Sequence, residues 1–152
     1  LCFLIEAGSV IGTEPPAPKP QGVSTSAFVV FPADSNANPP MAFGGKLLAE
    51  MDRIAGITTR RFLYESPVGA RDAATVAING VKFHRPARVK DLVIVQGTVT
   101  KIGEKSVTVS VRVERETLDG RDAIRELLVE GEYVFVAYDL ANKCAIPHGL
   151  GK

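Results

Sequence analysis

Cysteine and histidine are both scarce in this sequence of 152 residues. The two cysteines, Cys2 and Cys144, lie near opposite ends of the sequence and form neither a metal-binding spacing nor a disulfide framework, which favours a reduced, cytoplasmic compartment. With His84 and His148 as the only histidines, a site that binds a metal through several histidines is nearly excluded.

An excess of one charge and a long hydrophobic run are also lacking. Lysine and arginine total 18 and aspartate and glutamate 17, so the formal net charge is +1 and nothing indicates a nucleic-acid partner. Residues 1–12 are mildly apolar, but they contain Glu6, lack a basic start and are too short to span a membrane, so neither a signal peptide nor a membrane partner is expected. The share of hydrophobic residues, 45%, is ordinary for one globular domain.

Prolines and glycines indicate how the chain is divided. Four prolines between residues 13 and 22 predict an extended linker. We therefore expect an N-terminal extension with this linker at residues 1–22, one globular domain at residues 23–141 and a C-terminal tail at residues 142–152. The tail contains Pro147 and two glycines and is expected to be loose.

The clearest helical period spans residues 42–64. Apolar residues recur there at steps of three and four and predict one long amphipathic helix. Asp52 falls at the edge of the apolar stripe, on a flank of small residues, while the other charges fall on the far side. The flank consists of Gly45, Ala49 and Gly56, and the far side of Lys46, Glu50, Arg53 and Arg60.

The start of this helix adds a second feature, the pair Gly44–Gly45. Backbone N–H groups in the first turn of a helix are free and lie at the positive end of its dipole. Gly44 and Asp52 are eight residues apart, about two turns, and so share roughly one side of the helix. An interpretation without function is also open, in which Asp52 is a solvated residue at the boundary of the apolar stripe and the glycines form a flexible helix start.

The rest of the sequence is mostly β. Apolar runs predict strands at residues 26–31, 74–85, 92–102, 106–117 and 127–139, with a loop at residues 118–124. The last strand is apolar or aromatic throughout residues 133–138, which predicts a central position covered on both faces. A strand, a long helix and four further strands joined by short turns predict an α+β fold, in which a curved antiparallel sheet of about five strands wraps the helix.

The dipeptide Asn79–Gly80 reverses the alternation within residues 74–85. It is a hairpin signal, but it also marks a β-bulge where something approaches the backbone. We favour the bulge, because a hairpin would leave two very short strands.

Three motifs resemble the hotdog-fold acyl-CoA thioesterases, in particular the cytosolic and bacterial acyl-CoA hydrolases. They are N-A-N at residues 36–38, F-G-G-K-L-L-A-E-M-D at 43–52 and V-K-F-H-R-P-A-R-V-K-D at 81–91, within a resemblance that covers roughly residues 28–139. Lys90 replaces the usual glycine of that family. The resemblance implies the hotdog fold, no metal or redox cofactor, and a homodimer joined edge to edge, often assembled into a hexamer as a trimer of dimers. It also implies active sites at the dimer interface, with Asp52 from one subunit and a loop asparagine, Asn36 or Asn38, from the other.

The residues suit the hydrolysis of an acyl-CoA thioester to a free fatty or other carboxylic acid and CoA. This reaction needs an activated water and donors for the oxyanion. Asp52 is the expected base or nucleophile, since no Ser-His-Asp or Cys-His set can be assembled at the helix. Gly44 and Gly45 are the expected oxyanion-binding amides. Asn38 is the candidate to orient the water or the thioester, although asparagine is also an ordinary turn former.

Candidate substrate-binding residues fall into two groups. A basic group, most of it in one turn, is the candidate for binding the CoA phosphates, although a solvated basic loop has the same composition. It comprises Arg85, Arg88, Lys90 and Lys105. The second group comprises Phe43, Asn79 and Gly80. His84 alternates with Phe83 and is expected to pack or to face solvent rather than to act in catalysis.

Two other functions are open. A hotdog hydratase would need an acidic residue paired with a histidine, and no histidine lies near the helix in the sequence. A non-catalytic acyl-CoA-binding or regulatory hotdog module would not need an acid at Asp52. Measurement of free thiol release from acyl-CoAs separates the three functions.

Overall fold

The computed structural model describes residues 22–36, 38–119 and 122–151. Its elements in chain order are β1 (Val23–Val29), the short 3-10 helix η1 (Pro32–Asp34), α1 (Gly44–Leu63), β2 (Ala73–Phe83), β3 (Leu92–Ile102), β4 (Ser106–Asp119), β5 (Asp122–Asp139) and β6 (Cys144–Ala145). The extension predicted at residues 1–22 lies outside the described residues apart from Gly22, so the division of the chain into segments stays a prediction. No helix in the described part of the chain is long and apolar enough to cross a membrane.

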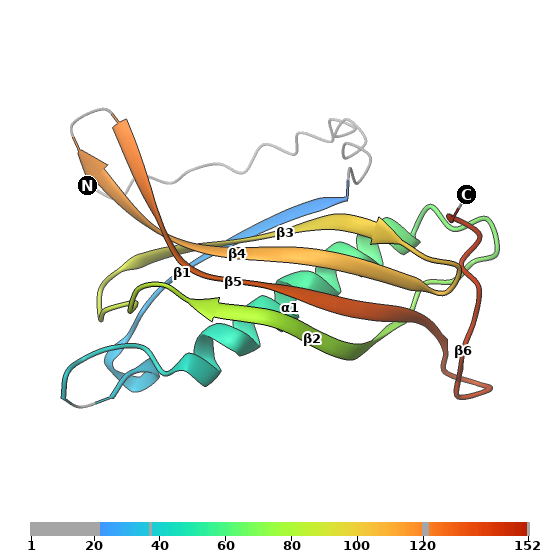
Figure 1. Ribbon diagram of the computed structural model, residues 1–152, viewed down its shortest axis with the longest axis horizontal. Coiled ribbons are helices and arrows are strands. Elements are labelled where there is room, and N and C mark those ends of the chain that lie inside the picture. The colour runs from blue at the N-terminus through green and yellow to red at the C-terminus, as the bar shows by residue number, and fades with distance from the viewer. Residues whose placement is uncertain (1–21, 37, 120–121, 152) are drawn as a thin grey trace, which may run out of the picture.

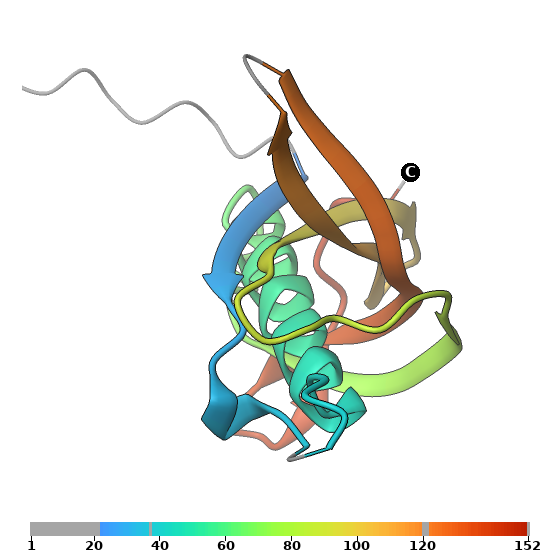
Figure 2. The ribbon, with the colours of Figure 1, turned by 90° about the vertical axis from the view of Figure 1, so that its left-hand side faces the viewer.

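The strands form one curved antiparallel sheet. Its order is β1-β3-β4-β5-β2, and β6 adds a short pairing to the end of β5. Figure 1 shows α1 lying along one face of this sheet, and the view in Figure 2 shows the strands curving around the helix. The predicted α+β fold is confirmed, and β3 has the predicted bounds.

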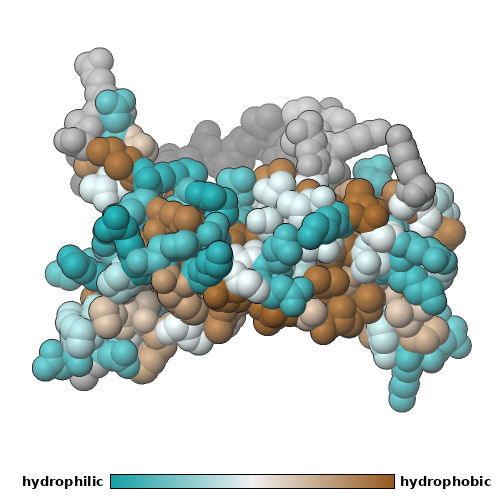
Figure 3. All heavy atoms as spheres, in the orientation of Figure 1, coloured by the Kyte–Doolittle hydropathy of each residue, from teal (hydrophilic) through white to brown (hydrophobic). Residues whose placement is uncertain are grey.

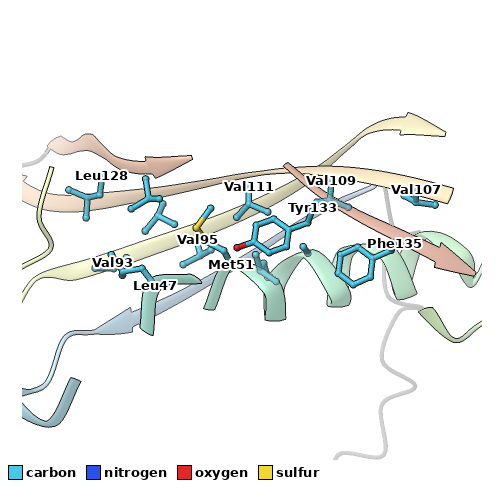
Figure 4. Close-up of a cluster of buried hydrophobic side chains, with 14 of the residues drawn as sticks. Leu47, Met51, Val93, Val95, Val107, Val109, Val111, Leu128, Tyr133 and Phe135 are labelled. Carbon is cyan, nitrogen blue, oxygen red and sulfur yellow. The ribbon is translucent and has the colours of Figure 1, made fainter. Parts of the chain in front are cut away.

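The core fills the space between α1 and the concave face of the sheet. Strict alternation in β4 places four valines on that face, and each is fully buried: Val107, Val109, Val111 and Val113. Met51 from α1 and Tyr133 from β5 pack among them (Figure 4). Because burial of one such side chain contributes roughly 1.5–3 kcal/mol, this layer fixes how the helix lies on the sheet.

Gly97 lets α1 approach β3 closely. A Cβ at this position would lie 2.7 Å from Thr58 Oγ1 and 3.4 Å from the carbonyl oxygen of Ile54. Thr58 is fully buried, and its hydroxyl donates to that same carbonyl at 2.7 Å. We expect Gly97→Ala to lower the free energy of unfolding by about 1–3 kcal/mol, as overpacked cores do, when it is measured by urea denaturation.

The double variant Gly97→Ala/Thr58→Ala is the control for this prediction. Removal of the Thr58 hydroxyl relieves the shortest contact, so the double variant should lose less stability than the two single losses added together. Simple additivity would show that the contact with Thr58 is not the cause.

The hairpin between β4 and β5 is longer than predicted. Residues 118–124, predicted as a loop, continue both strands, and Leu118 pairs with Ala123. Ion pairs across the two strands, Arg115 with Glu126 and Arg125 with Glu116, favour the extended ladder over a loop. We call residues 114–119 and 122–126 the arm; Figures 1 and 2 show these two strand segments projecting beyond the rest of the sheet.

The described residues cover strand β5 on one face only. It lies between β4 and β2, so β4 rather than β5 is the middle strand. Tyr133, Phe135 and Ala137 are buried, whereas Val134 and Val136 on the opposite face are half-buried. The prediction of two covered faces is therefore wrong for the single chain, because the described residues supply only one layer over the sheet.

The segment after Asn142 is packed, so the predicted loose tail is wrong. β6 pairs with the end of β5, and His148 is fully buried. The carbonyl of His148 accepts a hydrogen bond from Ser66 Oγ at 2.6 Å, and its ring Nε2 lies 3.3 Å from the carbonyl oxygen of Ser106. These polar contacts hold the segment to β4 and to the turn after α1, despite its proline and glycines.

Candidate active site

The first turn of α1 presents open backbone amides. Phe43 occupies the N-cap position and makes no side-chain cap. Lys46 and Leu47 both donate their N–H groups to the Phe43 carbonyl, at 3.0 and 3.3 Å. Within the described residues, the N–H groups of Gly44 and Gly45 donate to no backbone carbonyl. A Cβ at Gly45 would meet nothing within 4 Å, so a ligand can reach this end of the helix.

Asp52 lies two turns further along α1 and is half-buried. Thr75 of β2 donates its hydroxyl to Asp52 Oδ1 at 3.0 Å. Asp52 accepts no other side-chain hydrogen bond from the described residues, which leaves Oδ2 free to accept a proton from water. Sequence reasoning missed Thr75, because a threonine in a predicted strand carries no spacing signal that links it to a helix 23 residues earlier.

Tyr133 lies beneath this part of the helix. Its hydroxyl donates to the carbonyl oxygen of Leu48 at 3.3 Å. Burial, and secondly the charge of Asp52, raise the pKa of Tyr133 to about 12. The phenol therefore stays neutral near pH 7 and is not a base, so Asp52 is the group at this point of the helix that can accept a proton.

Glu50 is not on the solvated side of α1 as predicted. It is only 7% exposed, because Lys46 and Arg53 cover its carboxylate. Lys46 Nζ lies 3.1 Å from Glu50 and 3.4 Å from Asp34, and the hydrogen bond to Glu50 is the main cause of the raised pKa of Lys46. The charge of Lys46 is thus compensated internally, although it lies next to the open amides.

The two loop asparagines are exposed and lie beyond the N-terminal end of α1 (Figure 1). Hydrogen bonds close their loop: Asn36 N donates to the Met41 carbonyl at 2.9 Å. Gly44 and Asp52 are separated by about 12 Å along the helix axis, and Asn38 precedes Gly44. One chain therefore does not bring Asn38 and Asp52 together. The contacts of Asn36 and Asn38 do not decide which of them is the loop asparagine of the site.

The basic turn between β2 and β3 lies at the same end of α1. A backbone bridge joins Arg88 to Met41, just before the helix. Arg85 forms an ion pair with Glu126 at 2.9 Å, whereas Arg88 and Lys90 form none with the described residues. Lys90 has a φ of 76°, a left-handed conformation that glycine adopts without strain and that is uncommon for lysine.

Other predicted substrate-binding residues do not lie with the basic turn. Lys105 follows β3 and so lies at the opposite end of the sheet from the basic turn (Figure 1). A register shift between Asn79 and Lys82, with Gly80 at a φ of +58°, confirms the predicted bulge. Asn79 and Gly80 line a hollow with Ser110, whose side chain points away from α1.

Phe43 is exposed beside Gly44. His84 contacts Glu130 at 3.0 Å and, as expected, is exposed.

A family model described as the thioesterase superfamily matches residues 40–120, the segment that carries α1, β2, the basic turn, β3 and β4. The chain belongs to this superfamily.

An uncharacterized acyl-CoA thioester hydrolase of Bacillus subtilis is 36% identical over 114 residues, which are 75% of this chain and 61% of that protein. The chain thus spans about three fifths of that relative's length. An acyl-CoA thioester hydrolase of Salmonella typhimurium is 29% identical over 82% of this chain and 89% of its own length. Among solved structures, an apo-hexameric acyl-CoA thioesterase superposes with a TM-score of 0.71 at 30% identity, over 86% of this chain and 78% of its own.

The site residues of this superfamily member form two groups along α1. In the described residues, no group of three His, Cys, Asp or Glu side chains could hold a metal ion. The structure brings together Asp52, Thr75 and Tyr133 at the middle of α1, and the glycine amides with the basic turn at its start. These two groups of residues lie about two helical turns apart in one chain.

Proposed function

We propose that this chain hydrolyses acyl-CoA thioesters to a carboxylic acid and CoA, with Asp52 as the general base or nucleophile. The observation that carries the proposal is the half-buried Asp52 carboxylate, oriented by Thr75 at 3.0 Å and with its second oxygen free. The acyl-CoA hydrolase relatives support the substrate class. A single carboxylate suffices to deprotonate an attacking water or to attack the thioester carbon itself.

The spacing along α1 requires two subunits for one reaction. A reacting carbonyl must lie about 3 Å from both the nucleophile and the oxyanion donors. Gly44 and Asp52 of one helix are about 12 Å apart, so they cannot serve the same carbonyl. In the proposed site, Asp52 of one subunit therefore faces the Gly44 and Gly45 amides and the loop asparagine of a partner subunit.

The free edge of the sheet supports such a dimer. Among the described residues β2 pairs only with β5, and its side chains Val76 and Ile78 are 56% and 49% exposed. Figure 3 shows hydrophobic atoms gathered along the region of β2. Pairing of two β2 edges would satisfy the unpaired backbone groups and bury these side chains. A hexamer of three dimers, a cytoplasmic location and the lack of nucleic-acid or membrane partners belong to the same proposal.

A panel of acyl-CoAs assayed for free thiol release tests the function. Thiol release with production of the free acid supports the proposal. Binding of CoA without thiol release would indicate the non-catalytic module, and loss of an enoyl-CoA double bond without thiol release would indicate a hydratase. Light scattering of the purified protein gives the oligomeric state independently.

Charge reversal of Arg88 should reveal the CoA-binding turn. Arg88 is exposed and forms no ion pair with the described residues, so Arg88→Glu should raise KM for an acyl-CoA about tenfold or more. KM for an acyl-pantetheine, which lacks the nucleotide phosphates, should change little. Lys143→Glu, a reversal at another exposed cation after β5, is the matched control. Equal effects on both substrates would remove Arg88 from the site.

A further inference from the structure

The arm forms one wall of a surface hollow of about 500 Å³. Side chains alternate along its two strands, and the cross-strand pairs Arg115 with Glu126 and Thr117 with Ile124 belong to one face. These four residues line the hollow, while Arg88 and Asp91 of the basic turn line its other side. The opposite face of the arm carries Glu116, Leu118 and Arg125.

The charges inside this hollow are largely compensated. Arg115 contacts Asp91 at 3.3 Å and also forms an ion pair with Glu126, which Arg85 contacts at 2.9 Å from outside the hollow. Arg88 is the lining cation without an ion pair to the described residues. Ile124 lines the same hollow and is 54% exposed, so its apolar side chain is open to a ligand.

This combination suits a flat heteroaromatic ring. The face of such a ring packs on an aliphatic side chain or a guanidinium plane, and its polar edge meets hydroxyl and carboxylate groups. Ile124 and Arg88 supply the surfaces that pack against the two faces of the ring. Thr117, Asp91 and Glu126 supply the hydroxyl and carboxylate groups that meet its polar edge. An acyl chain would meet too many charges here, and a bare phosphate would meet two carboxylates.

We propose that this hollow binds the adenine ring of CoA and that Ile124 of the arm is a determinant of nucleotide specificity. The inference rests on the proposed acyl-CoA hydrolysis, because it takes CoA as the ligand. Arg88 lines the hollow and belongs to the basic turn, so a ring bound there places its ribose phosphates at that turn. The pantetheine part of CoA then leads from the basic turn toward α1.

The variant Ile124→Ser tests the proposal. It removes the apolar wall from an exposed position, so KM for an acyl-CoA should rise about fivefold to tenfold, while KM for the matching acyl-pantetheine stays unchanged. Leu118→Ser is the matched control, since Leu118 is 73% exposed at the neighbouring cross-strand pair but on the other face of the arm. It should change neither KM.

A binding measurement separates this inference from the proposed reaction. In an Asp52→Asn background, calorimetry should show that Ile124→Ser weakens CoA more than pantetheine. Equal weakening of both ligands, an equal effect of Leu118→Ser, or a change of oligomeric state in both arm variants would overturn the adenine site. If the wild-type protein binds CoA but releases no thiol from any acyl-CoA, the proposed hydrolysis fails and the calorimetry still decides the site.

Discussion

Asp52→Asn is expected to lower kcat for acyl-CoA hydrolysis by about 100-fold or more while the fold survives. Asparagine keeps the shape of the side chain and an oxygen that accepts the Thr75 hydroxyl at the present 3.0 Å. It lacks the second carboxylate oxygen, so it can neither deprotonate a water nor attack the thioester. The measurement is kcat by thiol release, with thermal unfolding followed in parallel.

Glu65→Gln is the control for this substitution. Glu65 is an exposed acid just beyond the C-terminal end of α1, so its neutralisation changes the net charge equally. The control should keep the wild-type kcat. A near-normal kcat in Asp52→Asn would eliminate the proposed mechanism, whatever the control does.

Two inactive variants should restore activity when their subunits mix. Asp52→Ala and Asn38→Ala each remove one component of every site in their own homodimers. In a mixed dimer, the wild-type Asp52 of one chain meets the wild-type Asn38 of the other, so one of its two sites is intact. Because statistical mixing makes about half of the dimers mixed, activity should return to roughly a quarter of wild type. The measurement is thiol release after the variants are unfolded and refolded together.

The matched control mixes Asp52→Ala with Asp52→Asn. Every site in that mixture lacks the carboxylate, so no activity should return. Failure of the first mixture, in dimers shown by mass spectrometry to be mixed, would place Asp52 and Asn38 in one site of the same chain or make Asn38 a turn residue only.

The sequence predicted most of the fold because its periods are regular. The valines of β4 alternate without a break, and β3 ends where its pattern ends, at Ile102. The arm was missed because Asp119, Gly120 and Asp122 have the composition of a loop, whereas paired charges several residues away stabilise the ladder. The packed segment at His148 was missed because its partners, Ser66 and Ser106, are distant in sequence.

The candidate site was predictable where it depends on one helix. The spacing of Gly44, Gly45 and Asp52 follows from helical geometry alone. Thr75 and the burial of Glu50 depend on how β2 and the neighbouring cations pack against that helix, which local patterns do not contain. Gly44 and Asp52 share one side of the helix, but the distance between them along the axis is too long for both to act on one substrate carbonyl. The two residues of one chain are therefore assigned to different active sites.

The strand order also determines when the sheet can close during synthesis. Phe83 pairs with Val129, 46 residues later, and Ala73 pairs with Ala137, 64 residues later. At about 5–20 residues per second, a ribosome makes β2 roughly 2 to 13 s before the partner positions on β5. Throughout that interval both edges of β2 are open, and Val76 and Ile78 lie in a nascent strand without a neighbour. The edge proposed to join two subunits is thus also a strand that stays unpaired on the growing chain until β5 is made, and its open backbone groups are a binding site for a chaperone.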